Sequence, residues 1–171
     1  PGAPLDEVVK SGGPLAGDEL AQVARGLAEA LEAIHECGVV HRDVKPGNVL
    51  LVDGEPVLID FGIAHIADDV RLTSTGLVMG TPGYLSPEIV DGAEVSEATD
   101  WWGWAATVAY AALGHPPFGT GPMDVVLSRV SRGQFDLVGM DPNLAPLIAA
   151  ALDPDPARRP STDEVLLGVE A

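Results

Sequence analysis

Apolar residues recur at three- and four-residue steps along residues 17 to 37, at Leu20, Val23, Leu27, Leu31 and Ile34. This spacing places them on one face of a helix, with acidic residues off the stripe, so we expect a helix with one buried face. Gly38 follows as a C-terminal stop signal. A shorter helix is predicted over about residues 5–10, before the helix-breaking residues "SGGP".

After Gly38 the pattern changes to short runs of β-branched and other apolar residues. These runs are "VV", "NVLLV" and "PVLID", and "DGE" between the last two predicts a hairpin turn. Because the runs are short, we expect a small ribbon that carries loops. Residues from about 69 to 87 are rich in Gly, Thr, Ser and Pro without a sustained period. A long loop of this kind inside a compact domain is usually functional.

The rest of the sequence predicts four helices, over about residues 99–113, 123–132, 144–152 and 162–169. The first of these is the most apolar, and its start carries Trp101, Trp102 and Trp104. We expect these rings to form a core, because a buried tryptophan removes about 150–250 Å² from water. The longest apolar run, residues 101–114, is shorter than the ~20 residues of a membrane span. The predicted class is α+β and mostly helical.

Composition narrows the function classes. The chain has 171 residues, enough for one domain, and 26 acidic against 9 basic residues, for a formal charge of −17. Nucleic acids and anionic membranes require clustered Lys and Arg, so we expect neither as a partner. No signal-peptide pattern is visible, and a cytoplasmic location is expected, with a membrane anchor elsewhere in the full-length protein as the alternative. The sequence lacks an initiator Met, and we expect it to be a piece of a longer protein.

Three residues have chemically versatile side chains but are expected to be structural. The single cysteine, Cys37, cannot form an internal disulfide, which fits a reducing compartment, and it is expected to be a small buried side chain. His35 lies on the apolar stripe and is expected to be a hydrogen-bonded core residue. His115, in "GHPPF", is expected in a loop.

Polar residues gather around the predicted hairpin. Asp43, Lys45 and Asn48 lie in a loop just after a short run, and Asp60 ends the next one. Because a hairpin brings its two ends together, Asn48 and Asp60 are expected to be neighbours and to present oxygen ligands to Mg²⁺. Asp43 is then left to meet a hydroxyl group, and Lys45 to neutralise a phosphate in transfer.

The segments "HRDVKPGN", "DFG" and "GTPGYLSPE" occur in this order. Together they resemble the signature set of eukaryotic-type protein kinases, and the phrases around them are similar to bacterial receptor-type Ser/Thr kinases. The resemblance extends over residues 1–171 but covers only the C-terminal lobe of the kinase fold. It implies a catalytic loop at 41–48 and an activation segment at 60–88, with the small β-ribbon carrying the catalytic and metal-binding loops.

The resemblance also assigns roles in ATP-dependent phosphorylation of Ser or Thr in protein substrates. It makes Asp43 the base that accepts the hydroxyl proton and Lys45 the neighbour of the γ-phosphate. Asn48 and Asp60 become Mg²⁺ ligands, with two ions in a complete kinase. The resemblance implies that ATP contacts Lys45, Asn48, Leu50 and Asp60.

Regulation is implied by the same family pattern. Arg42 beside the catalytic Asp is typical of kinases controlled by phosphorylation of the activation loop, and Thr73 and Thr75 are the expected acceptors, modified within a kinase dimer. A phosphate adds about −1.5 to −2 charges and pairs well with Arg. His65 stands where many relatives carry Lys or Arg, so we expect a weaker phosphate clamp at neutral pH. A solvent-facing His65 without a role is the alternative.

Five residues within or near the signatures are expected to be structural. In the family, His41 and Phe61 pack against the start of the helix at Asp100, whose carboxylate braces the catalytic loop. Glu88 and Arg159 resemble the buried ion pair that joins the end of the activation segment to the last helices.

Hallmarks of the family's N-terminal lobe are not found in these 171 residues, which contain no G-x-G-x-x-G and no V-A-I-K. We therefore expect the missing lobe to be a required partner and the fragment alone to be inactive. A non-catalytic interaction module remains the alternative, although the four catalytic positions are intact. A small-molecule phosphotransferase would share the catalytic loop but not "GTPGYLSPE".

Overall fold

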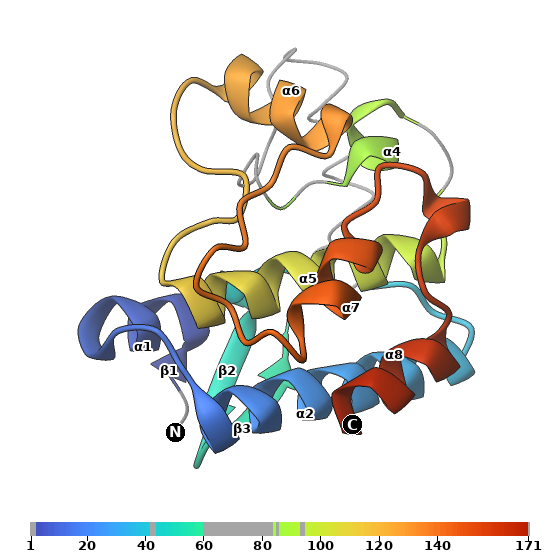
Figure 1. Cartoon of the computed structure of the whole chain (residues 1–171). Coiled ribbons are helices and arrows are strands. Elements are labelled where there is room, and N and C mark those ends of the chain that lie inside the picture. Colours follow the sequence, from blue (N-terminus) through green and yellow to red (C-terminus); the bar gives the residue numbers. More distant parts are fainter. Residues whose placement is uncertain (1–2, 42–43, 60–83, 85, 93–94, 171) are drawn as a thin grey trace.

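The computed structural model describes residues 3–41, 44–59, 84, 86–92 and 95–170 (Figure 1). The chain is mostly helical, with a small antiparallel sheet near its N-terminal helices. In chain order the described elements are β1 (Ala3–Pro4), α1 (Leu5–Gly12), α2 (Gly17–Glu36), η1 (Pro46–Asn48), β2 (Val49–Val52), β3 (Glu55–Leu58), α4 (Pro87–Val90), α5 (Glu97–Leu113), α6 (Met123–Arg132), α7 (Ala145–Ala151), η3 (Pro156–Arg158) and α8 (Thr162–Glu170).

The six helices predicted from periodicity are confirmed, with ends within two residues of the expected positions. Helix α5 shows why such ends are encoded locally. The Ser96 side chain accepts a hydrogen bond from the Ala98 N–H, and the Thr99 hydroxyl accepts one from the Ser96 N–H, as in a capping box. At the other end Gly114 adopts φ 81°, a left-handed conformation that glycine reaches without strain.

The sheet has the strand order β1-β2-β3, with both pairs antiparallel. Strands β2 and β3 form the predicted hairpin, in which Val49 lies opposite Leu58 and Val52 opposite Glu55. Asp53 and Gly54 make the turn with φ values of 53° and 84°, the positive pair that a two-residue hairpin turn requires. The two-residue strand β1 at the other edge is not predicted by the sequence pattern.

The predicted strand at "VV", residues 39–40, is wrong. The segment has no regular secondary structure, because its backbone groups bond elsewhere. The Val39 N–H bonds to the Ile34 carbonyl at the end of α2, and the His41 N–H bonds to a side chain. The segment therefore connects α2 to the next loop without joining the sheet.

Helix α5 runs through the middle of the molecule, with α2 on one side and α4 and α6 on the other (Figure 1). Its three tryptophans are essentially fully buried, which confirms the predicted core. The Trp104 indole donates to the Ala24 carbonyl of α2 at 3.0 Å, and the Trp101 indole to the Thr162 hydroxyl of α8 at 3.3 Å. Trp102 stacks on Phe118 with 5.5 Å between ring centroids. Helix α5 thus ties several surrounding segments together.

Helix α5 also approaches the loop after residue 43 very closely. A Cβ atom on Gly103 would lie 2.9 Å from both the Cβ and the carbonyl oxygen of Val44, closer than such contacts allow. Glycine at this position therefore sets how near the loop lies to the core helix. In the described part of the chain, no helix has the length and apolar character of a membrane span.

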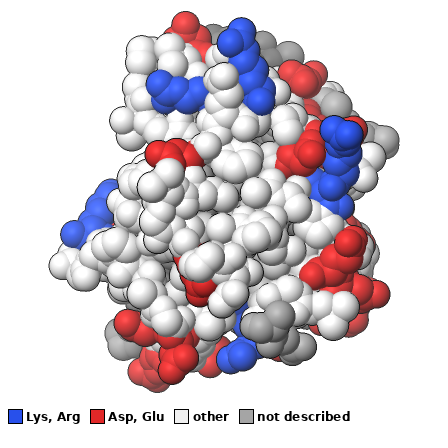
Figure 2. All heavy atoms as spheres, viewed as in Figure 1, with Lys and Arg blue, Asp and Glu red and all other residues white. Residues whose placement is uncertain are grey.

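The surface carries an uneven distribution of acidic side chains and an exposed cysteine. Figure 2 shows acidic side chains gathered on the lower part of this face, at the level of α2 and α8, while basic side chains are scattered. Cys37 is exposed, so the expectation of a buried thiol is wrong. The reason is its position: it is the C-cap residue of α2 and lies off the buried face that carries Leu31 and His35.

Candidate active site

A buried carboxylate organises the loop that carries the candidate catalytic residues. The Asp100 Oδ2 atom accepts the His41 backbone N–H at 2.7 Å and the His35 Nε2–H at 2.8 Å. All three residues are buried, and the His35 ring packs edge-on against Trp101 with centroids 5.6 Å apart. His35 is thus a hydrogen-bonded core residue, as its place on the apolar stripe predicts. The carboxylate fixes the backbone immediately before Arg42 and Asp43 in the sequence.

A second set of hydrogen bonds links His41 to the β2–β3 hairpin. The His41 ring Nε2 lies 2.9 Å from the Ile59 carbonyl oxygen and donates to it, since a carbonyl only accepts. The Ile59 N–H in turn donates to the Asn48 carbonyl oxygen at 2.9 Å. The described backbone thus brings Asn48 beside the residue that precedes Asp60 in the sequence.

Lys45 and Asn48 flank one short turn. Pro46 begins this 3₁₀ turn, where its missing N–H and fixed φ are tolerated. The Asn48 N–H bonds to the Lys45 carbonyl at 2.9 Å, Asn48 is buried, and Lys45 is partly exposed. Leu50 follows on β2, partly exposed, opposite Val57.

Several predicted site residues lie outside the described residues. They are Arg42, Asp43, Asp60, Phe61, His65, Thr73 and Thr75. Within the described ranges, no cluster of three or more His, Cys, Asp or Glu could hold a metal ion. The assignment of Asn48 and Asp60 to Mg²⁺ therefore stays a prediction.

A buried ion pair stands at the start of α4. The Arg159 guanidinium donates to both Glu88 carboxylate oxygens, at 2.6 and 2.8 Å, and also to the carbonyls of Ala98 and Asp153. The Thr99 hydroxyl donates to Glu88 at 2.8 Å. Burial alone would raise the pKa of Glu88, but the bonds from Arg159 and Thr99 bring it below its ordinary value. The pair joins α4, the start of α5 and the segment before α8.

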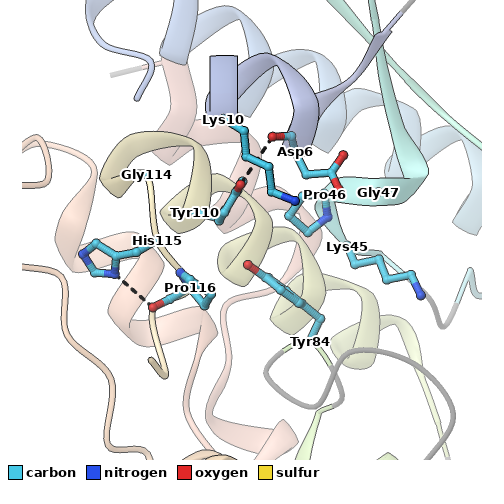
Figure 3. A pocket seen from close by; sticks show the side chains of 10 residues that line it. All are labelled: Asp6, Lys10, Lys45, Pro46, Gly47, Tyr84, Tyr110, Gly114, His115 and Pro116. Atoms are coloured by element: carbon cyan, nitrogen blue, oxygen red, sulfur yellow. Dashed lines mark hydrogen bonds between the residues drawn. The ribbon is translucent and has the colours of Figure 1, made fainter. Parts of the chain in front are cut away.

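A pocket of about 410 Å³ is lined by Lys45 together with residues of α1, the turn at Pro46 and the C-terminal end of α5 (Figure 3). Asp6 of α1, Tyr110 of α5 and Tyr84 contribute to its wall beside Lys45, and His115 lies at its edge. Sequence reasoning missed this site, since Asp6 and Tyr110 are 104 positions apart and neither belongs to a motif that would bring them beside the motif residue Lys45. The helical prediction for α1 and α5 could have placed Asp6 and Tyr110 on helices but not beside one another.

Comparisons with known proteins agree on one family. The family model described as the protein kinase domain matches residues 1–167. The probable serine/threonine-protein kinase PkwA of Thermomonospora curvata is 40% identical over 166 residues, covering 97% of this chain and 22% of that protein. The serine/threonine-protein kinase AfsK of Streptomyces coelicolor is 41% identical over 163 residues, covering 94% of this chain and 20% of that protein. The chain thus spans about a fifth of the length of these curated relatives.

A solved structure shows the same fold. The crystal structure of Rad53 residues 1–466 in complex with AMP-PNP superposes with a TM-score of 0.80 at 26% sequence identity. The similarity covers 97% of this chain and 43% of that one.

Replacing Arg159 by Ala is expected to destabilise the fold by about 3–5 kcal/mol, because it leaves the buried Glu88 carboxylate without its partner. For a chain of this size, the melting temperature should fall by about 6–20 °C in thermal unfolding followed by circular dichroism. The neighbouring Arg158 is exposed, so Arg158→Ala is the matched control and should melt as the parent does. An unchanged melting temperature for Arg159→Ala would refute a stabilising role for the pair.

The contribution of this pair should disappear in acid. Because the folded-state pKa of Glu88 is depressed below 4.5, its stabilisation is fully present above that value and is lost as the pH falls through the folded pKa. The difference in melting temperature between the parent and Arg159→Ala should therefore be constant from about pH 7 to 5 and should narrow below about pH 4.5. A difference that stays constant in acid would contradict the assigned pKa direction.

Proposed function

This chain belongs to the protein kinase domain family, and we propose that it forms the C-terminal lobe of an enzyme that phosphorylates Ser or Thr in proteins. The observation that carries the proposal is the set of bonds from Asp100 through His41 to the hairpin. These bonds hold His41, Asn48 and Ile59 in one fixed relation, and in the sequence Asp43 lies two residues after His41 and Asp60 one residue after Ile59. The names of the relatives, both bacterial Ser/Thr kinases, support the same substrate class.

In the proposed mechanism, Asp43 accepts the proton of the substrate hydroxyl as the oxygen attacks the γ-phosphorus of ATP. Lys45 stabilises the negative charge of the phosphoryl group in transfer. General-base assistance of this kind is typically worth about 10²–10⁴ in rate. The rigid turn between Lys45 and Asn48 limits how far the ammonium group and the amide can separate.

Magnesium fits the residues at the hairpin. Asn48 offers an amide oxygen from a buried position, and Asp60 adds a carboxylate one residue beyond Ile59, a pairing of oxygen donors that suits this hard cation. When bound, two ions would neutralise phosphate charge. ATP would lie against Lys45, Asn48, Leu50 and Asp60, and Leu50 is partly exposed on the hairpin.

A catalytic loop, an activation segment and an N-terminal lobe would complete the proposed kinase. Residues 41–48 would be the catalytic loop and 60–88 the activation segment. A Gly-rich loop and a strand Lys are absent from these 171 residues, so an N-terminal lobe in a longer chain would supply them and the isolated segment would be inactive. We place the enzyme in the cytoplasm.

We further propose that Thr73 and Thr75 are phosphorylated between two kinase copies. Arg42 and His65 would hold the added phosphate, with Arg42 contributing a permanent charge and His65 a charge that is present mainly in mild acid. The clamp would therefore be weaker at neutral pH than one built from two permanently charged residues.

Replacing Asp43 by Asn in the full-length protein should lower kcat for a Ser-containing protein substrate by at least about 100-fold, because the base is lost while the shape is kept. Phosphate incorporation measured by mass spectrometry checks this. Asp53→Asn is the matched control: it makes the same chemical change at the exposed hairpin turn, where Asn also tolerates the positive φ. Activity lost equally in both variants, or in neither, would count against the proposed base.

Peptide mapping of the full-length protein after incubation with ATP should find phosphate on Thr73 or Thr75, and the kinase should be more active afterwards. His65→Arg should increase this activation at about pH 7.5, where an imidazole with an ordinary pKa near 6.5 is mostly neutral. The increase should shrink near pH 6. Phosphate on neither threonine would remove the regulatory proposal, and an unchanged activation in His65→Arg would remove the role of His65.

A further inference from the structure

A second hollow, of about 380 Å³, lies where the start of α5 meets the start of α8, and we call it the α5–α8 hollow. None of its described lining residues lines the pocket beside Lys45. In Figure 1 the chain that leads into α8 passes the start of α5. The Trp101 indole N–H donates to the Thr162 hydroxyl at 3.3 Å, and the Arg159 guanidinium donates to the Ala98 carbonyl at 3.0 Å. These bonds fix the two helix ends relative to each other, so the hollow is preformed.

Acidic side chains line the α5–α8 hollow from both helices. Glu97 comes from the first turn of α5, and Asp163 and Glu164 come from the first turn of α8. Glu164 is held in place, because its Oε1 atom accepts the Ser161 N–H at 2.9 Å while its own N–H donates to the Ser161 hydroxyl, as in a capping box. Glu97 and Asp163 are exposed, and within the described residues neither carboxylate accepts a hydrogen bond. Two carboxylates are therefore left to bind a cation.

The one basic side chain among the described lining residues, Arg159, does not neutralise this charge. Its side chain is fully buried and donates to both oxygens of Glu88 and to the carbonyls of Ala98, Asp153 and Pro154. A guanidinium group has five N–H donors, and these five bonds use them. The accessible charge of the hollow is therefore negative.

Acidic residues at helix starts are favourable by themselves, so their presence alone does not indicate a ligand. The further observation is at His35, which is 8% exposed and whose Nδ1 atom has no hydrogen-bond partner among the described residues. Because Nε2–H already donates to Asp100, Nδ1 carries a lone pair in the neutral ring. This lone pair faces the Glu97 Oε1 atom at 3.7 Å, so two acceptors meet without a donor between them. A cation bound to Glu97 would offset this unfavourable contact.

We propose that the α5–α8 hollow docks an arginine side chain of a partner protein. Its guanidinium group would donate to Glu97 from one helix and to Asp163 from the other, beside the ring of Trp101 in the lining. The planar guanidinium spreads its donors over a fork and can reach carboxylates on two helices at once, whereas an ammonium group is a compact point charge. The net charge of −17 favours the approach of a basic segment. This docking is independent of the proposed function, because it uses no residue assigned to phosphoryl transfer.

The test uses the full-length protein and a peptide without Ser or Thr that carries one Arg beside a photo-crosslinking benzoylphenylalanine. After irradiation and digestion, mass spectrometry should locate the cross-links on residues 97–101 and 159–164. The peptide concentration that gives half-maximal labelling of these segments should rise by about tenfold or more when the Arg is replaced by Ala, as expected from the loss of a charge-assisted hydrogen bond. A peptide with Lys in place of Arg should require a clearly higher concentration than the Arg peptide.

Glu97→Gln should raise the half-maximal concentration of the Arg peptide by about tenfold, and Asp163→Asn should raise it in part. Glu19→Gln is the matched control, because Glu19 is an exposed acid in the first turn of α2, and this variant should be labelled as the parent is. Circular dichroism confirms that each variant is folded. The proposal is overturned if the cross-links are scattered over other acidic surfaces, if Glu97→Gln is labelled as the parent is, or if the Lys or Ala peptide labels as strongly as the Arg peptide. Because no phosphoryl transfer is measured, these outcomes judge the docking site separately from the proposed kinase activity.

Discussion

The acceptance of two hydrogen bonds by the buried Asp100 carboxylate is the interaction on which the candidate active site depends. A carboxylate in a dry interior is unfavourable unless donors surround it, and here a backbone N–H and an imidazole N–H do so. Its position in the first turn of α5 adds the favourable field of a helix N-terminus. The His41 N–H is thereby committed to this carboxylate and does not bond to a strand.

The start of α5 also forms hydrogen bonds with the second buried charged group, the Glu88–Arg159 ion pair. The Thr99 hydroxyl accepts a hydrogen bond from the Ser96 N–H and donates one to Glu88. The Arg159 guanidinium donates both to Glu88 and to the Ala98 carbonyl. One helical turn thus anchors the loop before Asp43, the end of the segment at α4 and the chain leading to α8. Because buried groups in such networks depend on one another, removing one donor affects more than the pair to which it belongs.

Local sequence signals predicted the helices and the hairpin well, and they failed where distant contacts decide. Helix α6 begins and ends where periodicity places it, and the Asp53–Gly54 turn follows from the backbone freedom of its residues. Residues 39–40 have the composition of a strand, but the Val39 N–H bonds to the Ile34 carbonyl of α2, and the N–H of the following His41 bonds to Asp100. The catalytic assignments came from motif order, and the structure describes Lys45 and Asn48 but neither Asp43 nor Asp60. The pocket could not be predicted, because nothing local indicates that Asp6 and Tyr110 meet.

Helix α5 connects the candidate active site and the pocket physically. Asp100 lies in its first turn and Tyr110 in its last, about 15 Å apart along a helix that is buried over almost its whole length. Between them, Gly103 admits the loop at Val44 so closely that the loop cannot shift toward the helix. Lys45 and Pro46 follow directly and form one wall of the pocket. The position of Lys45 and Pro46 relative to the rest of the pocket is therefore set by one rigid helix and the loop packed on it. A close-packed interior of this kind resists gradual deformation. Phosphoryl transfer depends on such fixed positioning, and the loop that carries Lys45 has it because Gly103 and Val44 pack in direct contact.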